Sequence, residues 1–89
     1  MFTNMTEVKK ANKEKGGHFF DKNTLRFFNS RIESSLLKNK YFITSEWYGE
    51  GFKRLYTIRE ALKDGSIKTI GKFQEHKTKE LAKEAIKKI

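Results

Sequence analysis

The clearest hydrophobic pattern lies at the end of the chain. Between residues 78 and 89, apolar side chains recur with helical spacing and therefore share one face. Thr78 is placed to cap this helix, and Glu80 in the first turn suits the helix dipole. The pattern predicts a helix from about Lys79 that covers one face of a sheet. Its expected apolar face consists of Leu81, Ala82, Ala85, Ile86 and Ile89.

The middle of the chain contains three runs that are rich in aromatic and β-branched residues, as is typical of strands. They are residues 40–47 (KYFITSEW), 53–59 (KRLYTIR) and 67–73 (IKTIGKF). Glycine-containing turns separate them, the second at residues 63–65 (KDG). Consecutive strands joined by short links predict an antiparallel meander.

The segment before these runs fits two structures. Residues 31–37 alternate apolar and polar positions as a strand does, but Ile32 and Leu36 also continue the helical spacing of the preceding segment. We expect a break near Asn29 and Ser30, followed by a short strand. The sheet would then have three or four strands.

Two helices are expected before the sheet. The run HFFDKNTLRFFNSRI predicts an aromatic helix from about Lys22 to Asn29, with Asp21 as its cap and Phe20 and Leu25 spaced as a hydrophobic staple.

The other helix is expected over residues 6–15, with Thr6 as its cap. Its only apolar positions are Val8 and Ala11, a stripe too thin to bury much surface. Two glycines at positions 16 and 17 end it.

Length and composition are those of one small domain. The 89 residues suffice for a single core, and eight Phe, three Tyr and one Trp supply large side chains for it. We expect residues 1–17 to form a polar N-terminal helix or flexible arm and residues 18–89 a single α+β domain. In this domain an antiparallel meander follows the aromatic helix, and the C-terminal helix packs on one sheet face.

The absence of cysteine excludes disulfide staples, thiol catalysis and cysteine-ligated zinc. No apolar run approaches the roughly 20 residues of a membrane span, and the polar start lacks the apolar stretch of a signal peptide. We therefore expect a cytoplasmic protein with no membrane partner.

Charge adds the main functional indication. Twenty Lys and Arg against eleven Asp and Glu give a net charge of +9, which attracts polyanions such as nucleic acids. Residues 51–89 hold most of the excess, with eleven basic residues against five acidic ones. The alternative is that a lysine-rich surface only keeps a small protein soluble.

Lys79, Lys83 and Lys87 are spaced by four and stack into one ridge of the predicted C-terminal helix. Lys72 and Lys77 would extend this ridge, so that several phosphates could be bound. The alternative is an ordinary solvated face on which glutamates pair with the lysines.

Aromatic residues suggest two further contacts. Arg54 and Tyr56 share one face of a predicted strand, where Tyr56 could stack on an unpaired base or pack under the covering helix.

Around the glycines at 49 and 51, Trp47, Tyr48 and Phe52 form an apolar loop. This loop could bind a partner or fold back to close the core.

The runs HFFDKNTLRFFNSRI, YFITSE, RLYTIRE and GKFQEHKTKELAKEA resemble a family of small, largely uncharacterised proteins encoded by phages, prophages and plasmids. The likeness covers Gly17 to Ala85. It implies a mobile-element accessory protein of a bacterial host cell that binds nucleic acid or blocks a host defence complex.

Two weaker resemblances point to nucleic acid. The order helix, three strands, helix is similar to double-stranded-RNA-binding domains, with Lys77, Lys79 and Lys83 where that family contacts phosphates, although this chain lacks the family's proline-containing loop. Residues 53–89 also resemble the arm-binding domains of phage integrases.

Catalysis has little support. His18 lies near Asp21, and His76 lies beside Glu75, but no metal-ligand or nucleophile motif is present. We therefore expect no enzyme, no cofactor and no metal. The leading hypothesis is a non-catalytic nucleic-acid-binding accessory protein. The alternative is a phage-encoded inhibitor of a bacterial defence nuclease, of the anti-CRISPR type, that binds the effector protein or its guide RNA.

Overall fold

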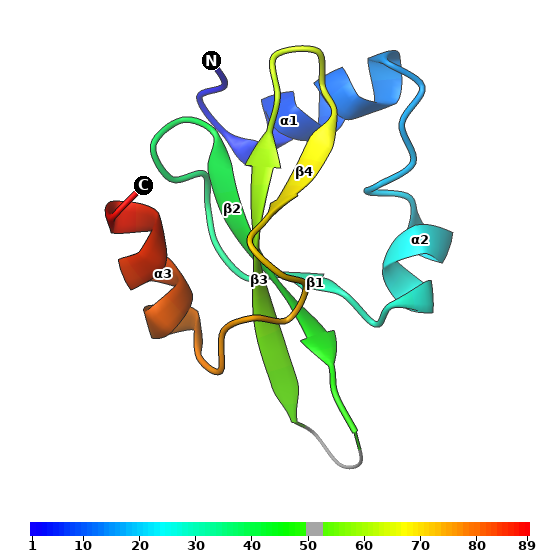
Figure 1. Cartoon of the computed structure of the whole chain (residues 1–89). Helices are drawn as coiled ribbons and strands as arrows, with labels where there is room; N and C mark the ends of the chain where they lie inside the picture. Colours follow the sequence, from blue (N-terminus) through cyan, green and yellow to red (C-terminus); the bar gives the residue numbers. More distant parts are fainter. Residues whose placement is uncertain (50–52) are drawn as a thin grey trace.

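A computed structural model describes residues 1–49 and 53–89, and its architecture is the expected α+β fold (Figure 1). Four antiparallel strands form one sheet in the order β1-β2-β3-β4, so the meander is confirmed with four strands. The helices are α1 (Met5–Glu14), α2 (Lys22–Phe27) and α3 (Lys79–Lys87). The strands are β1 (Arg31–Ile32), β2 (Tyr41–Trp47), β3 (Arg54–Ala61) and β4 (Ile67–Ile70).

The sheet separates two hydrophobic clusters, because successive strand residues point to opposite faces. On one face, Tyr41, Ile43 and Ile58 pack with residues of α3. On the other face, Phe42 and Ala61 pack with Val8 of α1. The central strand β2 is therefore buried on both sides, from Tyr41 to Glu46.

Helix α3 begins as expected but buries a narrower face than its sequence suggests. The Thr78 hydroxyl oxygen accepts a hydrogen bond from the Leu81 backbone N–H at 3.1 Å, which confirms the cap. Ala82 and Ile86 are buried, whereas Leu81 and Ile89 are 52% and 56% exposed. The expected five-residue apolar face is wrong at these two positions, because the face of α3 that packs on β2 and β3 leaves them at the surface.

Helix α1 starts at a different cap. Asn4, and not Thr6, caps it, since its side-chain oxygen accepts from the Glu7 backbone N–H at 3.0 Å. Val8 is completely buried against Phe42, so the thin apolar stripe still anchors the helix to the sheet.

Helix α2 ends at Phe27 because Asn29 adopts a left-handed conformation, with φ of 49°. The Ser30 N–H then donates to the Leu25 carbonyl at 2.7 Å, and the Asn29 N–H donates to the Arg26 carbonyl at 3.0 Å, which is a Schellman motif. The expected break at Asn29 and Ser30 is confirmed, and the short strand β1 follows it.

Asp21 lies where a cap of α2 was expected, but the expected capping hydrogen bond is absent. Its carboxylate lies 2.8 Å from His18 Nδ1 instead. The two side chains are exposed, so this contact contributes little stability.

Candidate functional site

The lysine ridge, defined as Lys79, Lys83 and Lys87, runs along α3. Lys83 and Lys87 are exposed and Lys79 is partly buried. Lys87 Nζ lies 3.2 Å from a Glu84 carboxylate oxygen. Both side chains are well exposed, so the ion pair is weak and Lys87 can bind another anion in place of Glu84. Between residues 77 and 88, five lysines stand against two glutamates, so the helix surface is basic overall.

The structure adds a fourth basic residue to this surface. Lys38, in the turn before β2, donates from Nζ to the carbonyl oxygens of Lys87 at 3.3 Å and Ile89 at 3.1 Å. It lines a groove together with Lys83 and Lys87. Sequence reasoning missed Lys38 because 49 residues separate it from Lys87, and no local pattern reports such a contact.

Lys72 and Lys77 lie in the segment that joins β4 to α3, and both are exposed. This segment is fixed to the sheet, because His76 exchanges two backbone hydrogen bonds with Tyr56, at 2.8 and 3.0 Å. Lys77 is therefore held at the start of α3, next to Thr78. Lys72 lies further back, where its backbone N–H donates to a Glu75 carboxylate oxygen at 2.8 Å.

Arg54 and Tyr56 are engaged within the chain rather than grouped with the ridge. Arg54 donates from Nε to the Ser45 hydroxyl at 2.6 Å, and from Nη2 to the Ser45 carbonyl at 2.7 Å and to the Asn29 carbonyl. Tyr56 is partly buried against the cluster that α3 covers. The packing interpretation of Tyr56 therefore has structural support.

The aromatic loop is described in part. Trp47 and Tyr48 follow one another at the end of β2, where they are 49% and 51% exposed. Phe52 lies outside the described residues. The two described aromatics thus stand at the surface at the distal end of the β2–β3 hairpin (Figure 1).

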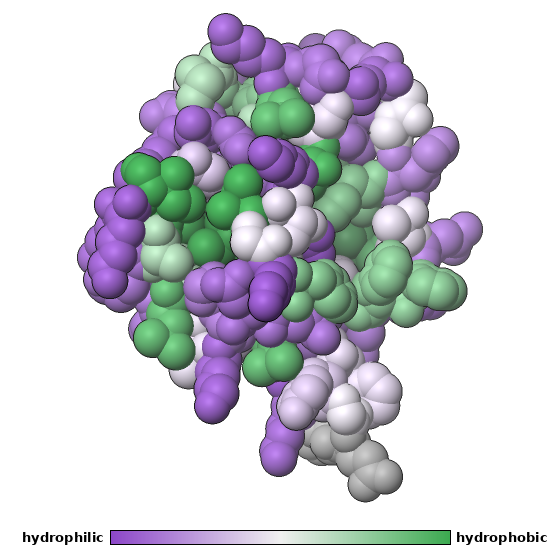
Figure 2. Space-filling model, viewed as in Figure 1, coloured by the Kyte–Doolittle hydropathy of each residue, from purple (hydrophilic) through white to green (hydrophobic). Residues whose placement is uncertain are grey.

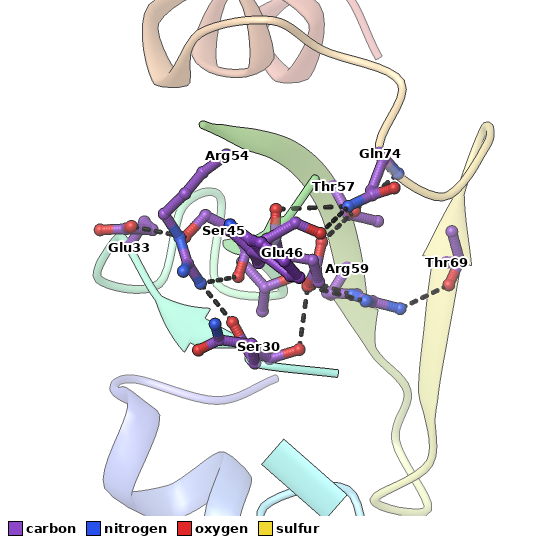
Figure 3. A network of polar contacts seen from close by, with 12 residues as sticks. Ser30, Glu33, Ser45, Glu46, Arg54, Thr57, Arg59, Thr69 and Gln74 are labelled. Carbon is purple, nitrogen blue, oxygen red and sulfur yellow. Dashed lines mark hydrogen bonds and ion pairs between the residues drawn. The ribbon is translucent and has the colours of Figure 1, made fainter. Parts of the chain in front are cut away.

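A buried polar network, which no sequence motif predicts, crosses the sheet on the face opposite α3 (Figure 3). Glu46 is 1% exposed and Arg59 is 9% exposed, and Arg59 Nη2 lies 3.2 Å from Glu46 Oε2. Hydroxyl groups complete the network: Thr57 donates to Glu46 at 2.8 Å and Ser30 donates to Glu46 at 3.2 Å. The sequence signal was a glutamate near the end of a strand rich in aromatic and β-branched residues.

Burial lowers the pKa of the Arg59 guanidinium, while the charge of Glu46 and its hydrogen bond oppose that shift. Arginine stays protonated in proteins, so the pair remains ionic. The ion pair fixes β2 against β3, because each strand contributes one of the two side chains.

Each of the two histidines has one carboxylate neighbour. His18 meets Asp21, and His76 Nε2 lies 3.9 Å from Glu75. Among residues 1–49 and 53–89, no group of three or more His, Asp or Glu side chains could hold a metal ion. In the same described part of the chain, no helix is long and apolar enough to cross a membrane.

These features define a small basic α+β domain with a four-stranded antiparallel meander and a lysine-bearing helix on one sheet face. The chain belongs to DUF7447, a family of unknown function whose model matches residues 4–87. No curated protein and no solved structure matches the chain significantly.

Proposed function

We propose that this protein is a non-catalytic nucleic-acid-binding accessory protein of a phage or other mobile element. The observation that carries the proposal is the grouping of Lys38 with the lysine ridge of α3, in a chain of net charge +9. Lysines that are grouped on one surface bind a nucleic acid because each neutralised phosphate releases condensed counterions. The double-stranded-RNA-binding and integrase arm-binding likenesses agree with this partner class.

The geometry suits a run of phosphates. Lys77 is fixed before α3 by the backbone pairing of His76 with Tyr56, and the ridge continues from it for the length of the helix. A nine-residue helix is about 13 Å long at 1.5 Å per residue, so the ridge spans several phosphates of one strand.

The test replaces Lys79, Lys83 and Lys87 together by Gln. Fluorescence anisotropy with labelled single-stranded and duplex oligonucleotides should show a loss of affinity of at least about tenfold, since three phosphate contacts are removed. The matched control replaces Lys9, Lys10 and Lys13 of α1 by Gln, which removes the same charge from another helix. Equal losses in the two variants would refute a site on α3, and absence of binding by the unmodified protein would refute the function.

A second candidate is a phage-encoded inhibitor of a bacterial defence nuclease. It is favoured by Trp47 and Tyr48, because half-exposed aromatics at a hairpin end are typical anchors of protein interfaces. Such an inhibitor binds the effector protein or its guide RNA. Trp47→Ala should then abolish capture of the effector at an unchanged melting temperature and with little salt dependence. Capture that disappears after nuclease treatment would instead assign the contact to nucleic acid.

A further inference from the structure

The sheet face opposite α3 carries a pocket of about 300 Å³ that the lysine ridge does not use. It lies between α2 and Phe73 of the segment after β4, and apolar side chains gather over α2 at the surface (Figure 2). Phe19, Leu25 and Phe28 form its other apolar walls, and Arg59 and Ser30 are polar lining residues. Its volume is at the lower end for ligand pockets, roughly 300 to 1,000 Å³, which suits a single ring system.

The two outer walls are held by the backbone. Phe28 ends α2 just before Asn29, whose left-handed conformation closes the Schellman motif. Phe73 precedes Gln74, whose backbone N–H donates to the Thr57 hydroxyl at 2.8 Å and whose side-chain amide donates to the Trp47 carbonyl at 3.2 Å. The ring centroids of Phe28 and Phe73 are 6.2 Å apart. The pocket is therefore formed before any ligand arrives.

Arg59 gives this apolar pocket a specific polar group. Its Cζ lies 5.3 Å from the Phe19 ring centroid and 5.6 Å from that of Phe73. A guanidinium has five N–H donors. Three of them are bonded, to the hydroxyls of Thr44 (3.0 Å) and Thr69 (2.7 Å) and to Glu46 (3.2 Å).

The other two donors have no hydrogen-bond partner among the residues that the structure describes. The carboxylate of Glu46 already balances the charge of Arg59, so the pocket is close to neutral. It therefore favours a neutral ligand with a flat ring and a hydrogen-bond acceptor over a free anion.

We infer that this pocket receives an unpaired nucleobase with a carbonyl oxygen, such as thymine, from a single-stranded nucleic acid. The inference rests on the proposed function and narrows its ligand class. Aromatic walls stack or pack against a base, and N–H donors of Arg59 bind its carbonyl. The thymine methyl group suits the apolar lining.

The pocket and the lysine ridge are linked by a short stretch of chain. Lys72 directly precedes Phe73, and Lys77 leads into the ridge. The segment from Lys72 to Lys77 is anchored to β3 at His76. A strand whose base enters the pocket thus has basic residues beside the pocket rim and along α3 for its phosphates.

The first experiment tests the pocket without phosphates. Thymidine is titrated into the isotope-labelled full chain, and deoxyribose serves as the ligand control. We expect chemical-shift changes at Phe28, at Phe73 and at the Arg59 Nη–H groups with thymidine only. Phe73→Ala and Phe28→Ala should remove them. Leu81→Ala should not, because Leu81 is 52% exposed on α3 and does not line the pocket.

The second experiment uses an oligothymidylate of about 12 nucleotides and an abasic strand of equal length. Phe28→Ala or Phe73→Ala should weaken binding of the oligothymidylate by roughly 5- to 100-fold, the range expected for one stacked base. Binding of the abasic strand should not change. The ridge variant, in which Gln replaces Lys79, Lys83 and Lys87, should lose affinity for both strands and keep the thymidine shifts. This result separates the pocket from the phosphate contacts.

The outcomes distinguish the two claims. In one outcome, thymidine causes no shifts in the unmodified protein, and the phenylalanine variants bind the oligonucleotide as tightly as the unmodified protein does. This outcome overturns the pocket inference and leaves the proposed function intact. Thymidine shifts without oligonucleotide binding support the pocket and refute the ridge. Concentration-dependent shifts at Phe28 and Phe73 without ligand, with a dimer in sedimentation, would assign the pocket to a second copy of the chain and also overturn the inference.

Discussion

Among single residues, Gly65 is tightly constrained by the backbone of another element. It adopts φ of 94°, and a Cβ built on it would lie 2.4 Å from the Ala11 carbonyl oxygen of α1. The Asn12 side-chain amide donates to the Gly65 carbonyl at 2.9 Å, and Asn12 is 5% exposed. The β3–β4 turn therefore docks on α1 through its backbone, and only glycine permits that approach.

Gly65→Ala should lower the free energy of unfolding by more than about 1 kcal/mol, because it combines an unfavourable φ with a backbone clash. Gly16→Ala is the matched control, since Gly16 has φ of 92° with nothing within 4 Å of the added Cβ. Urea unfolding measures both. Equal losses in the two variants would mean that the turn does not rest on α1 as described.

At the scale of elements, the Glu46–Arg59 pair joins β2 to β3 inside the protein. Both residues are buried, at 1% and 9% exposure, so each charge depends on the other. Such pairs stabilise a fold less than their short distance suggests, because desolvation opposes the attraction. Removing one partner, however, leaves an uncompensated charge.

Glu46→Leu and Arg59→Met should each destabilise the protein by about 3 to 5 kcal/mol. The double variant should lose clearly less than the sum of the two, because no buried charge is left without a partner. Urea unfolding of all four proteins gives the coupling energy. Losses that simply add would show that the two groups do not interact.

The elements also show what the sequence could predict. The cap of α3 at Thr78, the break at Asn29 and the strand β2 follow from local signals, so they were predicted correctly. The exposure of Leu81 could not be predicted, because it depends on which strands lie under α3.

The pairing of Glu46 with Arg59 depends on strand register, in which Thr44 lies opposite Thr57. Lys38 reaches the end of α3 only through the tertiary fold. The lysine ridge itself was predictable, because it lies on a single helix. The pocket was not, because it combines residues from four separate parts of the chain.

At the scale of the whole molecule, the sheet separates two kinds of surface. One face carries α3 and its lysines, and the other carries α1, α2 and the aromatic pocket (Figure 1). The molecule is only 18 Å across in its thinnest direction. The segment between β4 and α3 carries Phe73 of the pocket and leads into the helix that bears the lysine ridge. A single strand of nucleic acid could therefore contact both surfaces around one edge.

Under the proposed function, the lysines of α3 bind phosphates. The most direct measurement is the affinity for a labelled oligonucleotide over a series of salt concentrations, for the unmodified protein and the ridge variant. Neutralising about four phosphates predicts a slope of log affinity against log salt of roughly −3 to −4, and the ridge variant should flatten it by about 2 or more. A slope near zero for the unmodified protein, or the same slope in the ridge variant, would contradict the account.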